Sequence, residues 1–410
     1  MTNVQPGAAS AGPARLSATD RLPGTDRLHG LDALRGIALL LGLFVHASLA
    51  FLPGAQYFWV VADPNPSAWL GLAFYVPHMF RMLLFFLIAG FFGRLACERL
   101  GTKAFALDRF RRITLVLAAF WPIVFSGIIA AIVIIAMHAN NGALPENPPP
   151  GPAFTPGDFP LTHLWFLYVL TLCYAAMLAG RWLLTAADKA GRLNRLADRL
   201  VRLLTSPVGP ALLALPLAAA LAVTPGWFIW FGVPTPDMSL YPNLAACTAF
   251  GSAFLFGWWL HRQQALLARW VRQWPFHLAV ALAATAACLA IAGLGSGPAP
   301  AVPGMETWGY ALLYALGGWS STAALTGLAL RFLDAPSPAR RYLADASYWI
   351  YLMHLPLVMI LQAYAIRLPG PAPLKFAGIV ALTMLILLGS YRLFVRRTRL
   401  GAFINGKKRD

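Results

Sequence analysis

Acidic residues are scarce in this chain, and charged residues of either sign are uncommon. Only 15 of the 410 residues are Asp or Glu, against 32 Lys and Arg, and charged residues make up 11% of the total. A soluble domain carries about 25% charged residues, which excludes a single water-soluble fold. Because 59% of the residues are hydrophobic, much of the surface must face a solvent other than water.

Cysteine is also scarce, and the signatures of several enzyme classes are missing. The four cysteines lie in or beside apolar runs without paired loop spacing, so they indicate neither a disulfide framework nor a zinc site. The chain contains no P-loop, GxSxG, HExxH or Rossmann fingerprint. We therefore expect no bound metal and none of the chemistries that these motifs support.

The sequence does contain a series of apolar runs of about 20 residues, the length that crosses a bilayer core. They predict an all-α polytopic membrane protein of about ten transmembrane helices. The expected spans are 33–52, 69–92, 113–137, 161–183, 209–228, 243–260, 276–294, 308–330, 347–366 and 375–395. The span 209–228 is the weakest, because two prolines interrupt it, but transmembrane helices tolerate such breaks.

Basic residues cluster in the N-terminal tail, in every second connecting loop and in the C-terminal tail. The intervening loops 53–68, 138–160, 229–242 and 295–307 contain no Lys or Arg, and Arg367 in the last outside loop is the exception. This pattern places both termini in the cytoplasm and requires an even number of spans. The net charge of +17 then reflects topology and attraction to anionic lipid, so we expect no nucleic-acid partner.

The sequence divides into an N-terminal tail, a membrane domain and a C-terminal tail. Residues 1–30 are rich in Pro, Gly and Ala, lack an apolar signal region and predict a disordered cytoplasmic tail. Residues 31–397 form the membrane domain, and 398–410 form a basic cytoplasmic tail. Within the domain, the spacing of Arg and Leu over 186–204 predicts an amphipathic helix on the cytoplasmic leaflet.

Ionisable side chains at membrane depth are costly, which makes each of them a functional candidate. Arg35 and His46 are three helical turns apart, about 16 Å along one face. They would place a basic group at the cytoplasmic entrance and a general base near mid-membrane. His78 and Arg81 share a face of the next span, and Arg81 has no membrane carboxylate to pair with, which suits it to an oxyanion or an anionic substrate. The alternatives are helix anchoring, packing and snorkelling.

Three further groups of residues allow two readings. His163 lies beside Trp165, and His354 lies beside Tyr351. Their aromatic neighbours suit either interface belts or stacking on sugar faces. The remaining group is Arg109 and Arg112, which open the span 113–137 on the cytoplasmic side as a topological anchor or as a phosphate site.

Taken together, these residues resemble the acyltransferase family 3 of integral membrane O-acyltransferases over residues 28–395. The family pattern is matched by Arg35 and His46 in the first helix and by the Arg-x-x-Arg motif of Arg109 and Arg112. The segments 77–92, 163–168 and 347–356 are similar to the branch that contains the glucan biosynthesis protein C group, whose members are linked to succinylation of periplasmic glucans.

The resemblance implies a multi-pass enzyme of the bacterial inner membrane. It would transfer an acetyl or succinyl group from cytoplasmic acyl-CoA to a hydroxyl of a carbohydrate or glucan. Acyl-CoA would be a co-substrate, with no cofactor held permanently. The implied roles are catalysis by His46, Arg81 and His78, binding of acyl-CoA by Arg35, Arg109 and Arg112, and acceptor binding by His163, Trp165, Tyr351 and His354.

A second hypothesis is a transporter or flippase for an anionic small molecule or a carbohydrate lipid, with the intramembrane Arg and His residues as its binding site. Proton-coupled transporters often use Asp or Glu at membrane depth, and many are built from duplicated halves. The sequence has neither an intramembrane carboxylate nor a visible internal repeat. It leaves the oligomeric state open.

Overall fold

The computed structural model describes residues 28–147, 150–188, 191–294 and 304–406. Within these ranges the chain is helical, and its only extended pairing is an isolated bridge between Thr155 and Asp158. The expected all-α fold is confirmed. The helices are α1 (His29–Ser48), α2 (Leu70–Leu100), α3 (Thr102–Arg109), α4 (Leu115–Ala139), α5 (Trp165–Ala187), α6 (Arg192–Leu204), α7 (Gly209–Ala222), α8 (Leu244–Ala246), α9 (Ser252–Leu260), α10 (Leu267–Ala292), α11 (Met305–Phe332), α12 (Pro338–Ala365), α13 (Ala372–Ser390) and α14 (Arg399–Asn405).

Short helical turns of other kinds join or extend these helices. Two of them matter for the site: the π-helical turn η3 (Phe110–Thr114) continues α3 into α4, and the 3₁₀ turn η4 (Thr162–Leu164) leads into α5. Another π-helical turn, η8 (Tyr391–Val395), follows α13 and leads toward α14.

Among the described residues, seven helical segments are long and apolar enough to cross a membrane, or up to eight if the bent pair α6–α7 counts as one. The expected count of ten is not confirmed. Two expected spans, 243–260 and 276–294, lie in one helical run, Leu244–Ala292, that is kinked at Gln263. The expected span 308–330 lies in α11, which is not among the seven.

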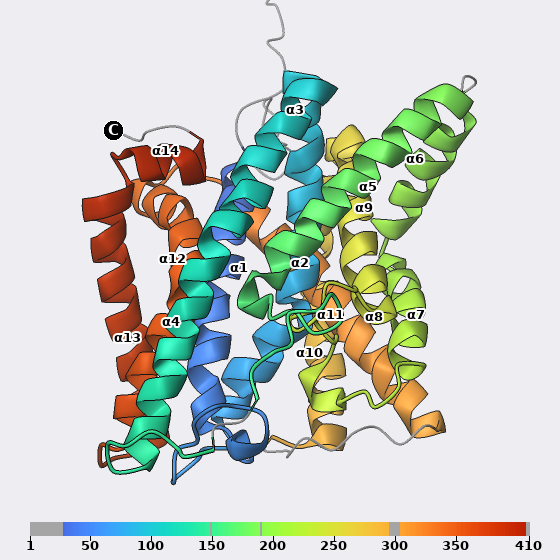
Figure 1. Cartoon of the computed structure of the whole chain (residues 1–410). Coiled ribbons are helices and arrows are strands. Elements are labelled where there is room, and N and C mark those ends of the chain that lie inside the picture. The colour runs from blue at the N-terminus through green and yellow to red at the C-terminus, as the bar shows by residue number, and fades with distance from the viewer. Residues whose placement is uncertain (1–27, 148–149, 189–190, 295–303, 407–410) are drawn as a thin grey trace, which may run out of the picture.

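The composition of α11 follows from its place in the bundle. It packs against α10, α7, α2 and α1, and its small or polar residues Gly317, Gly318 and Ser320 are buried between them. A helix that faces protein on most sides has little need of the hydropathy that lipid contact requires. Figure 1 shows α1 and α2 between a group formed by α4, α12 and α13 and a group formed by α7, α9, α10 and α11.

The tails and the segment 186–204 only partly resemble their expected forms. Residues 1–27 of the expected disordered tail lie outside the described residues, and α1 begins at His29. Residues 192–204 form the expected amphipathic helix, α6. The carboxylate of Asp188, which precedes the helix, accepts hydrogen bonds from the backbone amides of Arg192 and Leu193 at 2.7 and 2.9 Å. Part of the expected basic tail, 398–410, is also helical, as α14.

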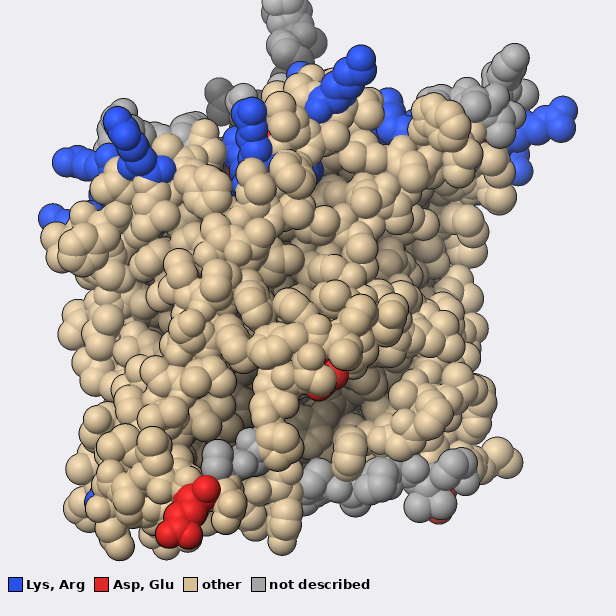
Figure 2. All heavy atoms as spheres, in the orientation of Figure 1, with Lys and Arg blue, Asp and Glu red and all other residues tan. Residues whose placement is uncertain are grey.

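Charge is distributed unevenly over the surface. On the face in Figure 2, Lys and Arg gather at the end of the bundle where Figure 1 places α3, α6 and α14, and the band below is almost free of charge. This asymmetry is what the positive-inside pattern of the sequence leads one to expect. The cytoplasmic location of the termini stays a prediction.

Close helix contacts fix the position of α2. A Cβ atom on Gly90 of α2 would collide with the carbonyl oxygen of Phe254, and one on Gly257 of α9 would collide with the carbonyl oxygen of Leu87. Small residues facing each other in this way let two membrane helices approach closely. The resulting contact holds α2, which carries Arg81, rigidly against α9.

A buried ion pair ties the loop after α1 to the start of α13. Lys375 Nζ lies 2.7 Å from Asp63 Oδ2, and the two side chains are 5% and 0% exposed. The Asp63 carboxylate also accepts a hydrogen bond from the backbone amide of Asn65 at 2.9 Å. The loop is thereby held against the helices that surround His46.

We expect Lys375→Met to lower the stability of the protein by about 3–5 kcal/mol, because it leaves the Asp63 carboxylate buried without a counter-ion. Thermal unfolding of the purified protein in detergent measures the effect. The exposed Arg367 lies in the adjoining turn, and Arg367→Met is the matched control. The double variant Asp63→Asn/Lys375→Met should recover most of the loss. If it is no more stable than the single variant, the ion pair does not carry the stability.

Candidate active site

Three histidines from distant parts of the chain meet near the middle of the bundle. His46 lies in the last turn of α1, His163 in η4 and His354 in α12. The ring of His354 lies 5.2 Å from that of His46 and 4.9 Å from that of His163, measured between centroids. The rings of His46 and His163 are 6.3 Å apart. The structure thus brings together His46 and two residues that the sequence predicts for acceptor binding.

One backbone carbonyl orients two of these rings. The oxygen of Tyr351 lies 3.0 Å from His163 Nε2 and 2.8 Å from His354 Nδ1. Because a carbonyl can only accept, both of these nitrogens carry the proton, and in the neutral rings His163 Nδ1 and His354 Nε2 are left as acceptors. Both free nitrogens are buried without a hydrogen-bond partner. The Tyr351 hydroxyl in turn donates to the carbonyl of His163 at 2.9 Å, so the two residues hold each other.

A proline explains why α12 can offer a second carbonyl, that of Leu352. Pro356 lies inside α12 and has no amide hydrogen, so the carbonyl of Leu352, four residues earlier, loses its usual helical donor. His163 Nε2 lies 3.3 Å from this Leu352 oxygen as well. Pro356 therefore frees a second backbone acceptor for His163 of η4, beside the Tyr351 carbonyl.

The three rings line a small cavity, which we call the histidine chamber, of about 30 Å³. Arg81 of α2, Trp165 and Tyr351 line it too, together with Ala38, Leu39, Met82, Phe85 and Phe166. Its volume is enough for about one water molecule. No Asp or Glu lines the chamber, so its charge comes from the Arg81 guanidinium, and such a site favours negative charge that develops during a reaction.

Arg81 reaches the chamber because α1 has a glycine where the two helices cross. A Cβ atom on Gly42 would collide with Nη1 of Arg81. Gly42 precedes His46 by four residues, so the guanidinium lies against the face of α1 that carries His46. The Nε atom of Arg81 is buried without a hydrogen-bond partner.

His78 is not among the residues that line the chamber. Its ring stacks on Phe74 at a centroid distance of 4.8 Å, and Phe74 stacks in turn on Trp230 at 5.0 Å. Although His78 and Arg81 are three residues apart, three steps of an α-helix leave their directions about 60° apart. This rotation takes His78 toward the loop that carries Trp230.

Sequence reasoning missed Gln362, a fully buried residue of α12 that orients the end of α1. Its Nε2 donates to the carbonyl oxygens of His46 and Ala47 at 3.0 and 3.1 Å, and its Oε1 accepts from Trp59 Nε1 at 2.9 Å. The ring of Trp59 stacks on His46 with a centroid distance of 6.3 Å. The amide thus satisfies carbonyls that a helix end leaves without donors. A glutamine within an apolar span was the available signal.

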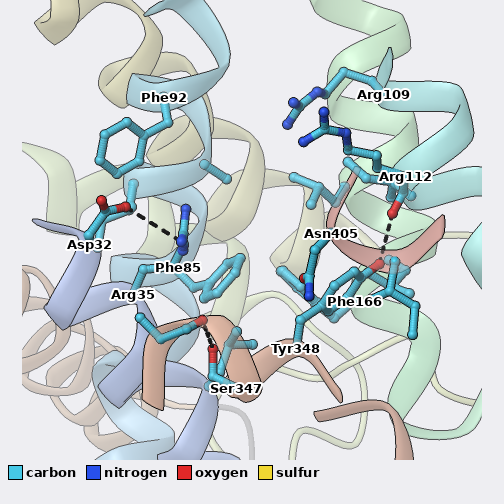
Figure 3. A pocket seen from close by; sticks show the side chains of 18 of the residues that line it. Asp32, Arg35, Phe85, Phe92, Arg109, Arg112, Phe166, Ser347, Tyr348 and Asn405 are labelled. Atoms are coloured by element: carbon cyan, nitrogen blue, oxygen red, sulfur yellow. Dashed lines mark hydrogen bonds and ion pairs between the residues drawn. The ribbon is translucent and has the colours of Figure 1, made fainter. Parts of the chain in front are cut away.

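A second cavity, the arginine pocket, has a volume of about 410 Å³ and is lined by Arg35, Arg109 and Arg112 (Figure 3). Each arginine has an acidic neighbour: Arg35 lies 3.4 Å from Asp32, and both Arg109 and Arg112 contact Asp108. A guanidinium has five N–H donors, so each retains donors for a ligand. The structure therefore brings together the three residues that the sequence predicts for binding acyl-CoA.

The turn η3 helps to present these arginines. It is π-helical and directly follows Arg109, and Arg112 lies within it. Tyr348 of α12 donates a hydrogen bond to the carbonyl of Arg112 at 2.9 Å, which holds this turn against α12. π-Helical turns are rare and occur often at functional sites.

The arginine pocket and the histidine chamber are neighbours. Leu39, Phe85 and Phe166 line both, and they form an apolar collar between them. Along α1, Arg35 faces the pocket, Leu39 the collar and His46 the chamber. Arg35 and His46 thus line adjoining cavities, and the expectation that they serve one ligand stays a prediction.

The described residues contain no group of three or more His, Cys, Asp or Glu side chains arranged to hold a metal ion. The groups that the chamber offers for chemistry are its imidazoles and its guanidinium. Neutral imidazoles can accept a proton from a hydroxyl or act as nucleophiles, and the guanidinium can stabilise an oxyanion.

Comparison with known proteins agrees with this chemistry. A family model described as an acyltransferase domain matches residues 28–392, nearly the whole chain, and this range includes every residue of the histidine chamber. No curated protein and no solved structure matches the chain. The expected family is confirmed: the chain belongs to the acyltransferase family 3 and is a multi-pass membrane acyltransferase.

Proposed function

We propose that this protein takes an acyl group from cytoplasmic acyl-CoA and transfers it to a hydroxyl of a carbohydrate or glucan at the membrane or its periplasmic side, in the inner membrane of a bacterium. The observation that carries the proposal is the pair of adjoining cavities. An arginine-lined pocket and a chamber of histidines and one arginine lie on either side of three shared apolar residues. A thioester donor has the same order of parts: phosphates, a flexible arm and a reactive acyl group.

The arginine pocket suits the phosphates of CoA. Its volume of about 410 Å³ lies within the usual range for small-molecule sites, about 300–1,000 Å³. Arg35, Arg109 and Arg112 present planar donors that match phosphate oxygens. The collar then directs the arm of CoA and its thioester toward His46.

His46 acts in the chamber by one of two routes. In the direct route, the acceptor oxygen attacks the thioester carbonyl while His46 takes the hydroxyl proton, and His46 then gives that proton to the departing thiolate. In the relay route, the His46 nitrogen first attacks the thioester, and the departing thiolate takes the proton of the acyl-imidazolium as CoA is released. The acceptor hydroxyl then attacks the acyl-imidazole, and its proton passes to the imidazole that is freed. Arg81 stabilises the oxyanion in both routes, or holds the carboxylate of a succinyl group.

The other histidines orient the acceptor. His163 and His354 each present a lone pair to the chamber, because the Tyr351 carbonyl holds their other nitrogens. A second hydroxyl of the acceptor that donates to such a fixed lone pair holds the attacking hydroxyl in position beside His46. Trp165 and Tyr351 provide aromatic surface for a sugar ring. The proposal gives His78 no chemical step, because its ring lies in a stack with Phe74. The resemblance to the glucan branch supports a glucan acceptor and a succinyl donor.

We expect His46→Ala to lower acyl transfer by about 10²–10⁴-fold, since it removes the base or acyl carrier. Membranes with matched protein levels are supplied with labelled acetyl-CoA or succinyl-CoA, and label is followed into carbohydrate. His138→Ala, at the end of α4, is the matched control and should stay active. An active His46→Ala enzyme contradicts the mechanism. Absence of transfer with either donor, together with solute movement in liposomes, supports a transporter instead.

We expect Arg112→Ala to raise the KM for acyl-CoA by about 10-fold, because it removes one charge-assisted contact to a phosphate, with little change in kcat. Steady-state kinetics with varied acyl-CoA measure both constants. Arg111 is exposed and does not line the pocket, so Arg111→Ala controls for the loss of a positive charge in the same turn. Equal effects of the two variants would indicate that these arginines anchor the start of the helix and do not bind acyl-CoA.

We expect Gly42→Ala to lower kcat by about 10- to 100-fold, because the added methyl group displaces the Arg81 guanidinium from the chamber. The KM for acyl-CoA should stay nearly unchanged, since the arginine pocket is not touched. The control is Gly378→Ala in α13, where a Cβ atom meets no other atom within 4 Å. Normal turnover by Gly42→Ala would show that the position of Arg81 does not limit the reaction.

A further inference from the structure

The C-terminal helix α14 contributes to the arginine pocket although the family match ends before it. The match covers residues 28–392, whereas α14 is Arg399–Asn405. Ile404 and Asn405 line the pocket together with Arg35, Arg109 and Arg112. A wall of the pocket therefore comes from a part of the chain that the family does not define.

Specific contacts hold α14 in this position. The Thr398 hydroxyl caps the helix by accepting from the amide of Gly401 at 3.4 Å, and it donates to the carbonyl of Phe394 at 2.8 Å. Gly401 packs so closely on the carbonyl of Val395 that a Cβ atom would collide with it. Ile404 is only 1% exposed. The helix is thus fixed against η3, η8 and α12.

The end of α14 touches one of the pocket arginines. Gly406 has a φ of +77°, a conformation that glycine adopts without strain, and a Cβ atom there would collide with the guanidinium of Arg112. Asn405, directly before it, is half-buried, and its carboxamide makes no hydrogen bond to the described residues. In Figure 3 its side chain lies between the two arginines of the Arg-x-x-Arg motif and Phe166.

We infer that Asn405 is a binding residue for the acyl donor and that its carboxamide pairs with an amide of the pantetheine arm of CoA. This assignment rests on the proposed function. Arginine side chains only donate, which suits them to phosphates, whereas a carboxamide both donates and accepts, as an amide of the arm does. The arm joins the phosphates to the thioester. A residue that lies between the arginines and the collar at Phe166, as Asn405 does, is therefore placed to contact the arm.

Binding to the purified full-length protein by titration calorimetry tests the assignment with two probes. CoA contains the arm and the phosphates, whereas adenosine 3′,5′-bisphosphate has no arm. We expect Asn405→Ala to weaken binding of CoA by about 3- to 10-fold, the range for one lost hydrogen bond, and to leave binding of adenosine 3′,5′-bisphosphate unchanged. Arg112→Ala should weaken both probes.

Two further variants separate the assigned contact from a general disturbance of the helix. Asn405→Gln keeps the carboxamide and should retain part of the affinity for CoA. Phe403→Ala changes an exposed residue of α14 that does not line the pocket and should bind both probes normally.

If Asn405→Ala binds CoA normally while Arg112→Ala binds it poorly, the role of Asn405 is overturned and the proposed donor is not. Equal weakening of both probes by Asn405→Ala would overturn its assignment to the arm. A wild-type protein that binds neither probe would overturn the proposed donor and this assignment with it.

Discussion

The backbone of α12 at Tyr351 is the feature on which the candidate site depends. Its carbonyl accepts from both His163 and His354, and its hydroxyl donates to the backbone of His163. Pro356 contributes by removing the donor that would otherwise occupy the Leu352 carbonyl. Inside a membrane an unsatisfied carbonyl is costly, so η4 is held to α12 by a contact that both segments need. The protonated nitrogens of the two rings, and hence their free lone pairs, follow from this contact.

Close packing of helix backbones at glycine residues also explains how Arg81 is accommodated. A guanidinium at membrane depth without a carboxylate partner is costly unless it faces a polar cavity. Here it passes over Gly42 of α1 into the histidine chamber, and the close packing of Gly90 and Gly257 holds its helix in place. The glycines are therefore part of the site, although none of them bears a functional group. They set the distance between helices that lets an arginine of α2 reach the same cavity as a histidine of α1.

The sequence predicts the site more completely than the number of spans. Periodicity puts Arg35 and His46 on one face, and both line adjoining cavities, because this relation depends only on the geometry of one helix. His78 and Gln362 show the limit: which way α2 is rotated, and which residue meets the end of α1, depend on partners distant in sequence. The expected count of ten spans is not confirmed, because length and hydropathy alone do not establish which helices cross the membrane. Hydropathy measures contact with lipid, and α11 is mostly in contact with protein.

The unequal sizes of the two cavities bear on the chemistry that we propose. A thioester close to a base is open to hydrolysis, so water is the competing acceptor that a transferase must exclude. The histidine chamber has room for about one water molecule, and the collar of Leu39, Phe85 and Phe166 separates it from the larger, polar pocket. An acyl group that enters through the collar fills that room, and the acceptor hydroxyl then has to come from the other side of the chamber. In the mechanism that we propose, the small volume of the chamber therefore requires donor and acceptor to enter by different routes.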